Sequence, residues 1–236
     1  MSSGRPELWV CNLGMVEYLE ALALQERIRA ARQRDELPDV MLLLEHPPVY
    51  TRGRRSGSGE LPMGEDWYRM QGFEIVQTDR GGKLTYHGPG QLVGYPIVRV
   101  DDVIAYLRKL ESGLVAALAE EGVAARGRVE DGPDYTGVWV DDRKIASIGV
   151  HLARGVTTHG FAVNIENDLQ PFEWVVACGL EGVRMTSLIK ETRRLAGQMP
   201  CFRRRAAYQV AEALGRRQRL VSLARLEAAT GVLATQ

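Results

Sequence analysis

The stretch RGGKLTYHGPGQ, residues 80–91, combines side chains that can donate or accept protons with a high density of glycine. A glycine pair lies near its start, a second Gly/Pro cluster lies near its end, and a lysine, a threonine, a tyrosine and a histidine lie between them. Glycine allows positive φ and lets the backbone approach a ligand closely. The stretch lacks the Gly-Lys-Ser/Thr ending of a Walker loop and the spacing of a dinucleotide fingerprint. The stretch is thus compatible with the wall of a ligand-binding site, although residue types alone favour an ordinary turn between two strands.

The four histidines, His46, His87, His151 and His159, do not form the pattern of a metal site. None shows the i, i+4 helical spacing of a zincin, and no cluster of carboxylates accompanies them. The residues therefore predict no bound metal.

The three cysteines are candidate nucleophiles. Their odd number and the lack of CxxC spacing argue against a disulfide framework and a cysteine-rich zinc site. Cys11 lies in an apolar run, where a thiol usually packs as a small hydrophobic group. Cys178 precedes a glycine in VVACGLEG, a context that can expose a nucleophile on a sharp turn. Cys201 precedes three arginines at the start of an expected helix, which lowers the pKa of a thiol, so the residues alone leave both open.

Lysine is rare, because only four of the thirty basic residues are lysine. Arginine cannot lose its proton in a protein, so a retained lysine is the better candidate for an amine that does. Lys144 lies at the mouth of an expected hairpin in DDRKIASIGV. Partial desolvation there favours the neutral amine and lets it act as a base or pair with a thiolate. A turn lysine that extends into water fits the same position, and Lys83 has the same two interpretations.

Strands and helices alternate around these residues, as their hydrophobic periodicity indicates. Residues 80–90 are expected on a turn or irregular connection. The order predicts a single α+β domain, residues 1–236, with helices packed on one side of a sheet. The expected strands are residues 7–14, 39–51 with a break at Pro47 and Pro48, 73–79, 91–100 and an antiparallel meander over 136–165; the expected helices are residues 16–36, 102–123 and the C-terminal part, about 200–236.

Charge and hydropathy argue against several classes of function. Thirty Lys plus Arg balance thirty Asp plus Glu, and the basic runs FRRR and GRRQR lack the aromatic interleaving of nucleic-acid binders. No apolar run has the length of a membrane span, and MSSGRPELWV is not typical of a signal peptide. We therefore expect a cytoplasmic protein that binds neither nucleic acid nor membranes. We also expect it to be a monomer.

Six separated blocks form a further pattern: EHPPVYTRG, RGGKLTYHGPGQLVGYPI, GVWVDDRKIASIGV, HGFAVNI, DLQPF and CGLEGVRMTSL. In this order and spacing, over about residues 8–190, the chain resembles the lipoyl(octanoyl) transferases, the octanoyl-[acyl-carrier-protein]:protein octanoyltransferases of lipoate synthesis. The resemblance implies a fold like that of biotin and lipoate protein ligases. That fold has a mixed, largely antiparallel sheet with helices packed on it.

The resemblance also assigns site residues by position. The acyl-carrying cysteine of the family falls on Cys178, and its lysine partner falls on Lys144. The residue before that cysteine is commonly proline in the family, and it is Ala177 here. The substrate-binding positions fall on Arg80, Gly81, Gly82, Lys83, Leu84, Thr85, Tyr86, His87, Ser147, Ile148, Gly149, His159, Gly160 and Phe161.

The implied reaction moves an octanoyl group from the thioester of acyl carrier protein to a lysine of a lipoyl domain, through a cysteine thioester. The implied acceptors are lipoyl domains of 2-oxoacid dehydrogenase complexes and the glycine cleavage H protein. An activated donor needs no metal and no cofactor. The alternatives are an ATP-dependent lipoate or biotin ligase, with RGRRSGSG as its adenylate loop, and a non-catalytic module that binds carrier or lipoyl domains. The C-terminal arginines could also dock an acidic carrier protein.

Overall fold

A large mixed sheet forms the centre of the molecule in the computed structural model, which describes residues 4–176 and 182–230. Ala177 and Cys178 therefore lie outside the described residues. The strands of this sheet are β1 (Glu7–Met15), β2 (Asp39–Glu45), β6 (Gln91–Ile97), β7 (Gly137–Val140), β8 (Arg143–Ala153), β9 (Val156–Asn164), β10 (Arg184–Met185) and β11 (Arg217–Leu220).

The strand order is β10-β8-β9-β6-β2-β1-β11, and β7 pairs with β8 outside this path. The pairs β2/β6, β6/β9, β8/β9 and β7/β8 are antiparallel. The pairs β1/β2, β1/β11 and β8/β10 are parallel. The expectation of a mixed, largely antiparallel sheet is therefore confirmed, as is the meander β7-β8-β9.

A small second sheet carries part of the glycine-rich stretch. Its strands are β3 (Val49–Arg52), β4 (Glu74–Gln77) and β5 (Thr85–His87), in the order β4-β3-β5. β5 pairs antiparallel with β3, so Thr85–His87 form a strand and only the residues around them turn. The expectation that the whole stretch is an irregular connection was wrong at these residues, because β5 pairs with a strand distant in sequence, with Thr85 opposite Thr51 and His87 opposite Val49.

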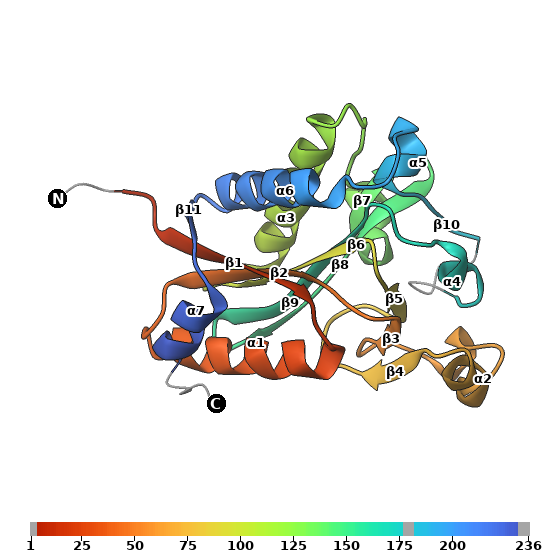
Figure 1. Cartoon of the computed structure of the whole chain (residues 1–236), viewed down its shortest axis with the longest axis horizontal. Helices are drawn as coiled ribbons and strands as arrows, with labels where there is room; N and C mark the ends of the chain where they lie inside the picture. The colour runs from red at the N-terminus through yellow and green to blue at the C-terminus, as the bar shows by residue number, and fades with distance from the viewer. Residues whose placement is uncertain (1–3, 177–181, 231–236) are drawn as a thin grey trace.

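Helices cover both faces of the large sheet (Figure 1). On one face lie α3 (Val103–Ala119) and α6 (Met199–Ala213), and on the other lie α1 (Tyr18–Gln33) and α7 (Leu223–Ala229). The expectation of helices on one side was wrong. β2 gives the reason, because its apolar residues do not alternate with polar ones: Met41 and Leu43 pack toward α3, while Leu42 and Leu44 pack toward α1. A strand buried on both faces needs a layer on each.

The ends of α3 follow from the residues at each end of the helix. The Asp102 side chain accepts hydrogen bonds from the N–H groups of Ile104 and Ala105 and caps α3. Gly122, at φ +82°, follows the end of that helix. The shorter elements are α2 (Glu65–Met70), α4 (Gln170–Glu173), α5 (Leu188–Thr192) and three 3₁₀ turns, η1 (Ser58–Glu60), η2 (Val129–Asp131) and η3 (Pro133–Tyr135).

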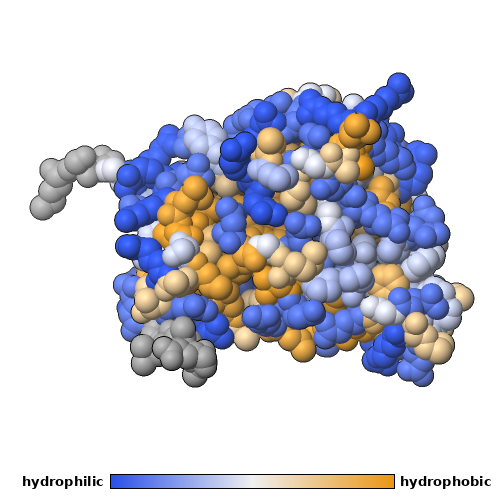
Figure 2. Space-filling model, in the orientation of Figure 1, coloured by the Kyte–Doolittle hydropathy of each residue, from blue (hydrophilic) through white to orange (hydrophobic). Residues whose placement is uncertain are grey.

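The C-terminal part is not helical throughout, contrary to the expectation. Arg217–Leu220 form β11, which runs parallel to β1 with Arg217 opposite Glu7. Figure 1 shows this strand at the edge of the sheet, between α6 and α7. Gly215, at φ +68°, separates α6 from β11, and its left-handed backbone ends the helix. Figure 2 shows hydrophobic residues gathered on this side of the molecule between the two helical layers.

The arginines of the C-terminal part have acidic partners within the chain. Arg216 lies 2.8 Å from a carboxylate oxygen of buried Asp39, and Arg203 lies 3.1 Å from Glu45. Arg205 pairs with buried Glu121 of the segment that follows α3. These pairs connect α6 and the residue before β11 to the rest of the fold.

Candidate active site

A cavity of about 270 Å³ lies where the glycine-rich stretch meets β8 and β9. Its lining brings together most of the residues that the sequence selected. These are Arg80, Gly81, Gly82, Lys83, Thr85, His87, Lys144, Ser147, Ile148, Gly149, His159, Gly160 and Phe161. The grouping of residues so distant in sequence supports one ligand-binding wall rather than an ordinary turn.

Two selected residues, Leu84 and Tyr86, do not line the cavity. They are buried in the core of the small sheet, and the Tyr86 ring packs on Tyr50 and Phe172. Side chains alternate along β5, so Thr85 and His87 face the cavity while Tyr86 points away. The expectation that Tyr86 shapes the cavity wall was wrong for this reason.

Glycine is required where the stretch approaches β8. The N–H of Gly81 donates to the carbonyl of Val150 at 2.9 Å. A Cβ at Gly149 would lie 2.9 Å from the Gly81 oxygen, which is too close for a side chain. Gly82 has φ +88°, a conformation that other residues rarely adopt. These glycines let two backbones meet and close one side of the cavity.

A chain of buried hydrogen bonds supports this wall from behind. Arg80 donates to the Thr51 hydroxyl at 2.8 Å, and that hydroxyl lies 3.4 Å from Nε2 of His87. Gln91 donates through Nε2 to Asn164 Oδ1 at 2.9 Å, so its Oε1 accepts from Nδ1 of His87 at 2.8 Å. His87 is therefore neutral with its proton on Nδ1, in keeping with burial that lowers its pKa well below the usual value.

A second buried histidine, His46, lies beside this chain. Its Nδ1–H donates to the carbonyl of Val16 at 2.7 Å, so its Nε2 accepts from the Tyr95 hydroxyl at 2.7 Å. Tyr95 and Tyr18 line the cavity, and the Tyr18 ring lies 5.1 Å from that of His46. Neither tyrosine could be recognised from the sequence, since each occupies an ordinary position in a helix or strand.

His46 makes stability depend on pH. Burial lowers its pKa to about 4, whereas the unfolded side chain binds a proton below about pH 6.5. Between these values unfolding takes up a proton, so stability falls as the pH falls. We expect about 3 kcal/mol of unfolding free energy to be lost from pH 7 to pH 4 through this group.

Urea denaturation at several pH values measures this loss, and His46→Gln is the control. His87 and His159 titrate in both proteins, so the difference between the two curves reports His46 alone. Parallel curves would show that His46 does not contribute.

His159 anchors the other end of the wall with a strained backbone. Its φ is +57°, and its N–H donates to Gln25 Oε1 of α1 at 2.7 Å. Its Nε2 lies 2.7 Å from Asp79, whose other oxygen contacts His151. Burial lowers the pKa of His159, and the hydrogen bond from His159 lowers the pKa of Asp79. The pair fixes the ring at the cavity wall.

Lys144 supplies the amine of the site. It lies in β8 with 2% of its surface exposed, and it lines the cavity. Gly137 makes room for it, because a Cβ there would lie 2.8 Å from Cε of Lys144. The carbonyl of Lys144 accepts from the Thr186 N–H at 3.0 Å, and Met185 of β10 lies beside it in register. Residues 184–186, which follow the undescribed residues 177–181, therefore lie alongside this lysine.

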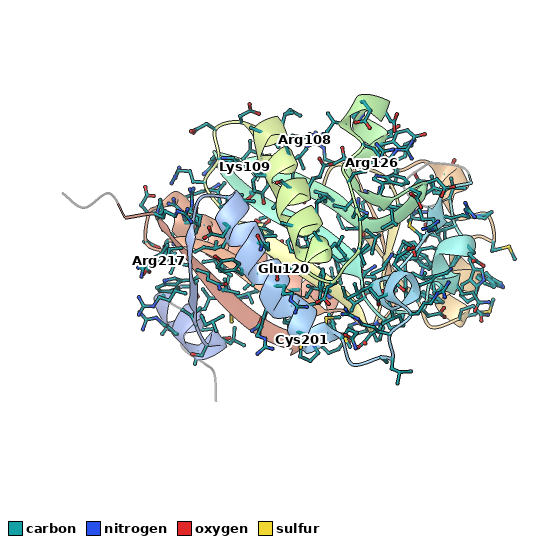
Figure 3. The ribbon with its side chains drawn as sticks, turned by 90° about the horizontal axis from the view of Figure 1, so that it is seen from above. Arg108, Lys109, Glu120, Arg126, Cys201 and Arg217 are labelled. Atoms are coloured by element: carbon teal, nitrogen blue, oxygen red, sulfur yellow. The ribbon has the colours of Figure 1, made fainter. Side chains whose placement is uncertain are left out.

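Neither of the two described cysteines lines the cavity. Cys11 is buried between the large sheet and α1, and burial raises the pKa of its thiol to about 11. Cys201 is exposed on α6, where its sulfur lies 3.7 Å from Arg204 (Figure 3). Cys201 therefore cannot serve this cavity from its position on the outer helical layer.

The loop after β3 is held against the glycine-rich stretch. The N–H groups of Arg54 and Arg55 donate to the carbonyls of Arg80 and Gly82 at 2.9 and 3.0 Å. The Arg55 side chain forms a 2.7 Å ion pair with Asp134, and both residues line the cavity. This segment, read as a possible adenylate loop in the ligase alternative, thus forms part of the cavity rim.

Among residues 4–176 and 182–230, no group of histidine, cysteine and acidic side chains is arranged to hold a metal ion. Within the same residues, no helix has both the length and the apolar character needed to cross a membrane.

Comparison with known proteins identifies the family. The model of the lipoyl protein ligase A/B catalytic domain matches residues 17–202. An octanoyltransferase of Solibacter usitatus is 48% identical over 173 residues, which cover 72% of this chain and 77% of that protein. The chain belongs to the octanoyltransferase family. Another member, from Salinispora tropica, is 44% identical over 204 residues, which cover 82% of this chain and 90% of that protein.

Two solved structures with a similar fold are lipoate protein ligases. A bipartite lipoate protein ligase of Thermoplasma acidophilum has a TM-score of 0.71 and 16% identity, over 98% of this chain and 99% of that chain. A lipoate-protein ligase A bound with ATP has a TM-score of 0.68 and 16% identity, over 98% of this chain and all of that chain. At this identity the likeness shows the fold alone, which confirms the expected ligase-like architecture.

Proposed function

We propose that this chain transfers an octanoyl group from the thioester of an acyl carrier protein to a lysine of a lipoyl domain, through a thioester on Cys178. Family membership gives the reaction class, an acyl transfer in protein lipoylation. One structural observation carries the proposal: the buried side chain of Lys144 and the glycine-rich stretch line the same cavity.

In the first half-reaction the Cys178 thiolate attacks the carbonyl carbon of the octanoyl thioester. A new carbon–sulfur bond forms, the bond to the carrier sulfur breaks, and the Lys144 ammonium gives its proton to the departing thiolate. Backbone N–H groups of the glycine-rich wall stabilise the oxyanion between these steps. One such donor contributes about 2.7–4 kcal/mol in other acyl transfers.

In the second half-reaction the lysine amine of the lipoyl domain attacks the octanoyl-Cys178 thioester. The amide bond forms, the Cys178 sulfur leaves, and Lys144 takes a proton from the attacking nitrogen. The enzyme returns to its starting state, so ping-pong kinetics follow. The donor is already activated, and this sequence of steps needs neither ATP nor a metal.

The cavity wall suits an acyl chain as well as a thioester. Leu107 of α3, Ile148 and Phe161 form an apolar part of the lining. Lys83 contributes positive charge to the same lining, whereas the charge of Arg55 is paired with Asp134. Apolar surface favours the hydrocarbon, and positive charge at the rim favours an acidic carrier protein.

The proposed acceptors are the lipoyl domains of 2-oxoacid dehydrogenase complexes and the glycine cleavage H protein, and the proposed location is the cytoplasm. The structure of the Thermoplasma ligase was studied with its own E2 lipoyl domain, which supports a lipoyl domain as the partner class for this fold. The monomeric state expected from the sequence stays a prediction.

Mass spectrometry of the intact enzyme tests the proposal. After incubation with octanoyl carrier protein and without ATP, we expect one octanoyl adduct, and peptide mapping places it on Cys178. A lipoyl domain added afterwards removes the adduct and gains the same mass. An adduct on Cys201 contradicts the proposed nucleophile, and a strict need for ATP favours the ligase alternative.

A further inference from the structure

The environment of Lys144 contains an aromatic residue that no step above uses. Trp139 of β7 is fully buried, and the register of β7 and β8 places it beside Lys144. The Lys144 Nζ atom lies 5.2 Å from the centroid of the Trp139 ring. A cation within about 6 Å of an aromatic face is attracted by the negative potential of that face.

The indole is held firmly in place. Its Nε1–H donates to the carbonyl of Tyr135 at 2.9 Å. The backbone N–H and carbonyl of Trp139 each bond to Arg126 at 2.8 Å, and Arg126 lies on the segment after α3 (Figure 3). The Arg128 guanidinium carbon also lies over this ring, 4.8 Å from its centroid. Because the ring is anchored at its nitrogen, on its backbone and by this second cation, it can fix the position of a flexible neighbour.

Gly137, two residues before Trp139, borders the Lys144 side chain and is itself fixed. Its N–H donates to Oε1 of Glu111 at 2.9 Å, and the other oxygen of this buried carboxylate contacts Arg108 on α3. Gly137 also has φ +141°, a conformation that favours glycine. The Lys144 stem is thus bordered by Gly137 and by the Trp139 ring, and both are held by α3 and the segments that follow it.

We propose that Trp139 is a positioning residue, which holds the Lys144 amine at the cavity wall and favours its ammonium form. Burial disfavours a charged amine, and the π face opposes that effect. The ammonium is the form that the first half-reaction needs, both to stabilise the thiolate and to protonate the departing carrier thiol. This inference rests on the proposed roles of Lys144 and Cys178.

An isosteric change gives the sharpest test. A trifluorotryptophan placed at position 139 keeps the shape of the ring and weakens the negative potential of its face. We expect the alkaline limb of the kcat/KM pH profile to move to lower pH, by about half a unit for this change and about one unit for Trp139→Leu. Trp139→Phe keeps a π face, so its alkaline limb stays within about 0.3 unit of the wild type.

Trp67 is the matched control, because it packs on Tyr68 and Trp174 and does not line the cavity. The same fluorinated residue at position 67 leaves the limb unmoved. If the limb stays in place when position 139 is fluorinated, or if Trp139→Phe and Trp139→Leu shift it equally, the inference is wrong. An octanoyl adduct on Cys178 with an unmoved limb contradicts this inference alone, whereas absence of the adduct contradicts the proposed function.

Discussion

Lys144→Met lowers the turnover of octanoyl transfer by about 10²–10⁴-fold, the usual contribution of a positioned acid or base. Methionine keeps an unbranched stem against Gly137 and Trp139, so the buried packing survives while the amine is lost. The effect on rate is large because both half-reactions move a proton through the same nitrogen. Steady-state kinetics with octanoyl carrier protein and a lipoyl domain measure it, with the melting temperature as a check on folding.

Lys144→Arg separates the charge of this residue from its proton transfer. Arginine keeps the positive charge but does not give up its proton. We expect Lys144→Arg to be as slow as Lys144→Met, with the larger head group also crowding the space beside Gly137. Full turnover in Lys144→Arg would mean that charge alone is enough and that another group moves the proton.

The part of the site that depends on local sequence could be predicted. The meander that carries Lys144 and His159 has short turns at Asp141 and at Arg154–Gly155, each with positive φ. Such turns fix strand direction and register through neighbouring residues. Local sequence could therefore predict the meander itself, whereas its grouping with the glycine-rich stretch came from the resemblance to the octanoyltransferase family.

The rest of the site depends on contacts between distant segments. Tyr18 comes from the first helix and Tyr95 from a central strand, and only the packing of α1 and β6 brings them to the cavity. Trp139 reads in sequence as an ordinary core residue of a short strand, and its position against the Lys144 amine follows from a register shift between Val138 and Trp139. No pattern in the sequence predicts the distance between the Trp139 ring and the Lys144 amine.

The C-terminal strand shows the same limit in the fold. GRRQRL contains charged residues typical of an exposed helix, yet it pairs with β1. Arg217 lies opposite Glu7 and forms an ion pair with it at 2.7 Å. The unpaired edge of β1 and the opposite charge of Glu7 on it outweigh the weak helix propensity of this segment. Neither the edge nor its distance from the segment can be predicted from a single sequence.

Replacement of each cysteine in turn tests which thiol is the nucleophile. Cys178→Ala abolishes detectable transfer, since no acyl thioester can form, whereas Cys11→Ala and Cys201→Ser keep turnover within about twofold of the wild type. Cys11 has a pKa of about 11, so only about one thiol in 10⁴ is ionised at pH 7, and it is buried away from the cavity. Cys201 lies beside Arg204, but it is exposed on α6 and does not line the cavity.

Cys178→Ser shows whether transfer activity is lost because the nucleophile is absent or because it is less reactive. A serine can accept the acyl group only as a less activated oxygen ester, and Lys144 pairs with an alcohol less well than with a thiolate. We therefore expect a residual rate or a trapped octanoyl ester in Cys178→Ser, and neither in Cys178→Ala. Retained transfer in Cys178→Ala, together with a loss in Cys201→Ser, would move the chemistry to α6 and out of the cavity that contains Lys144.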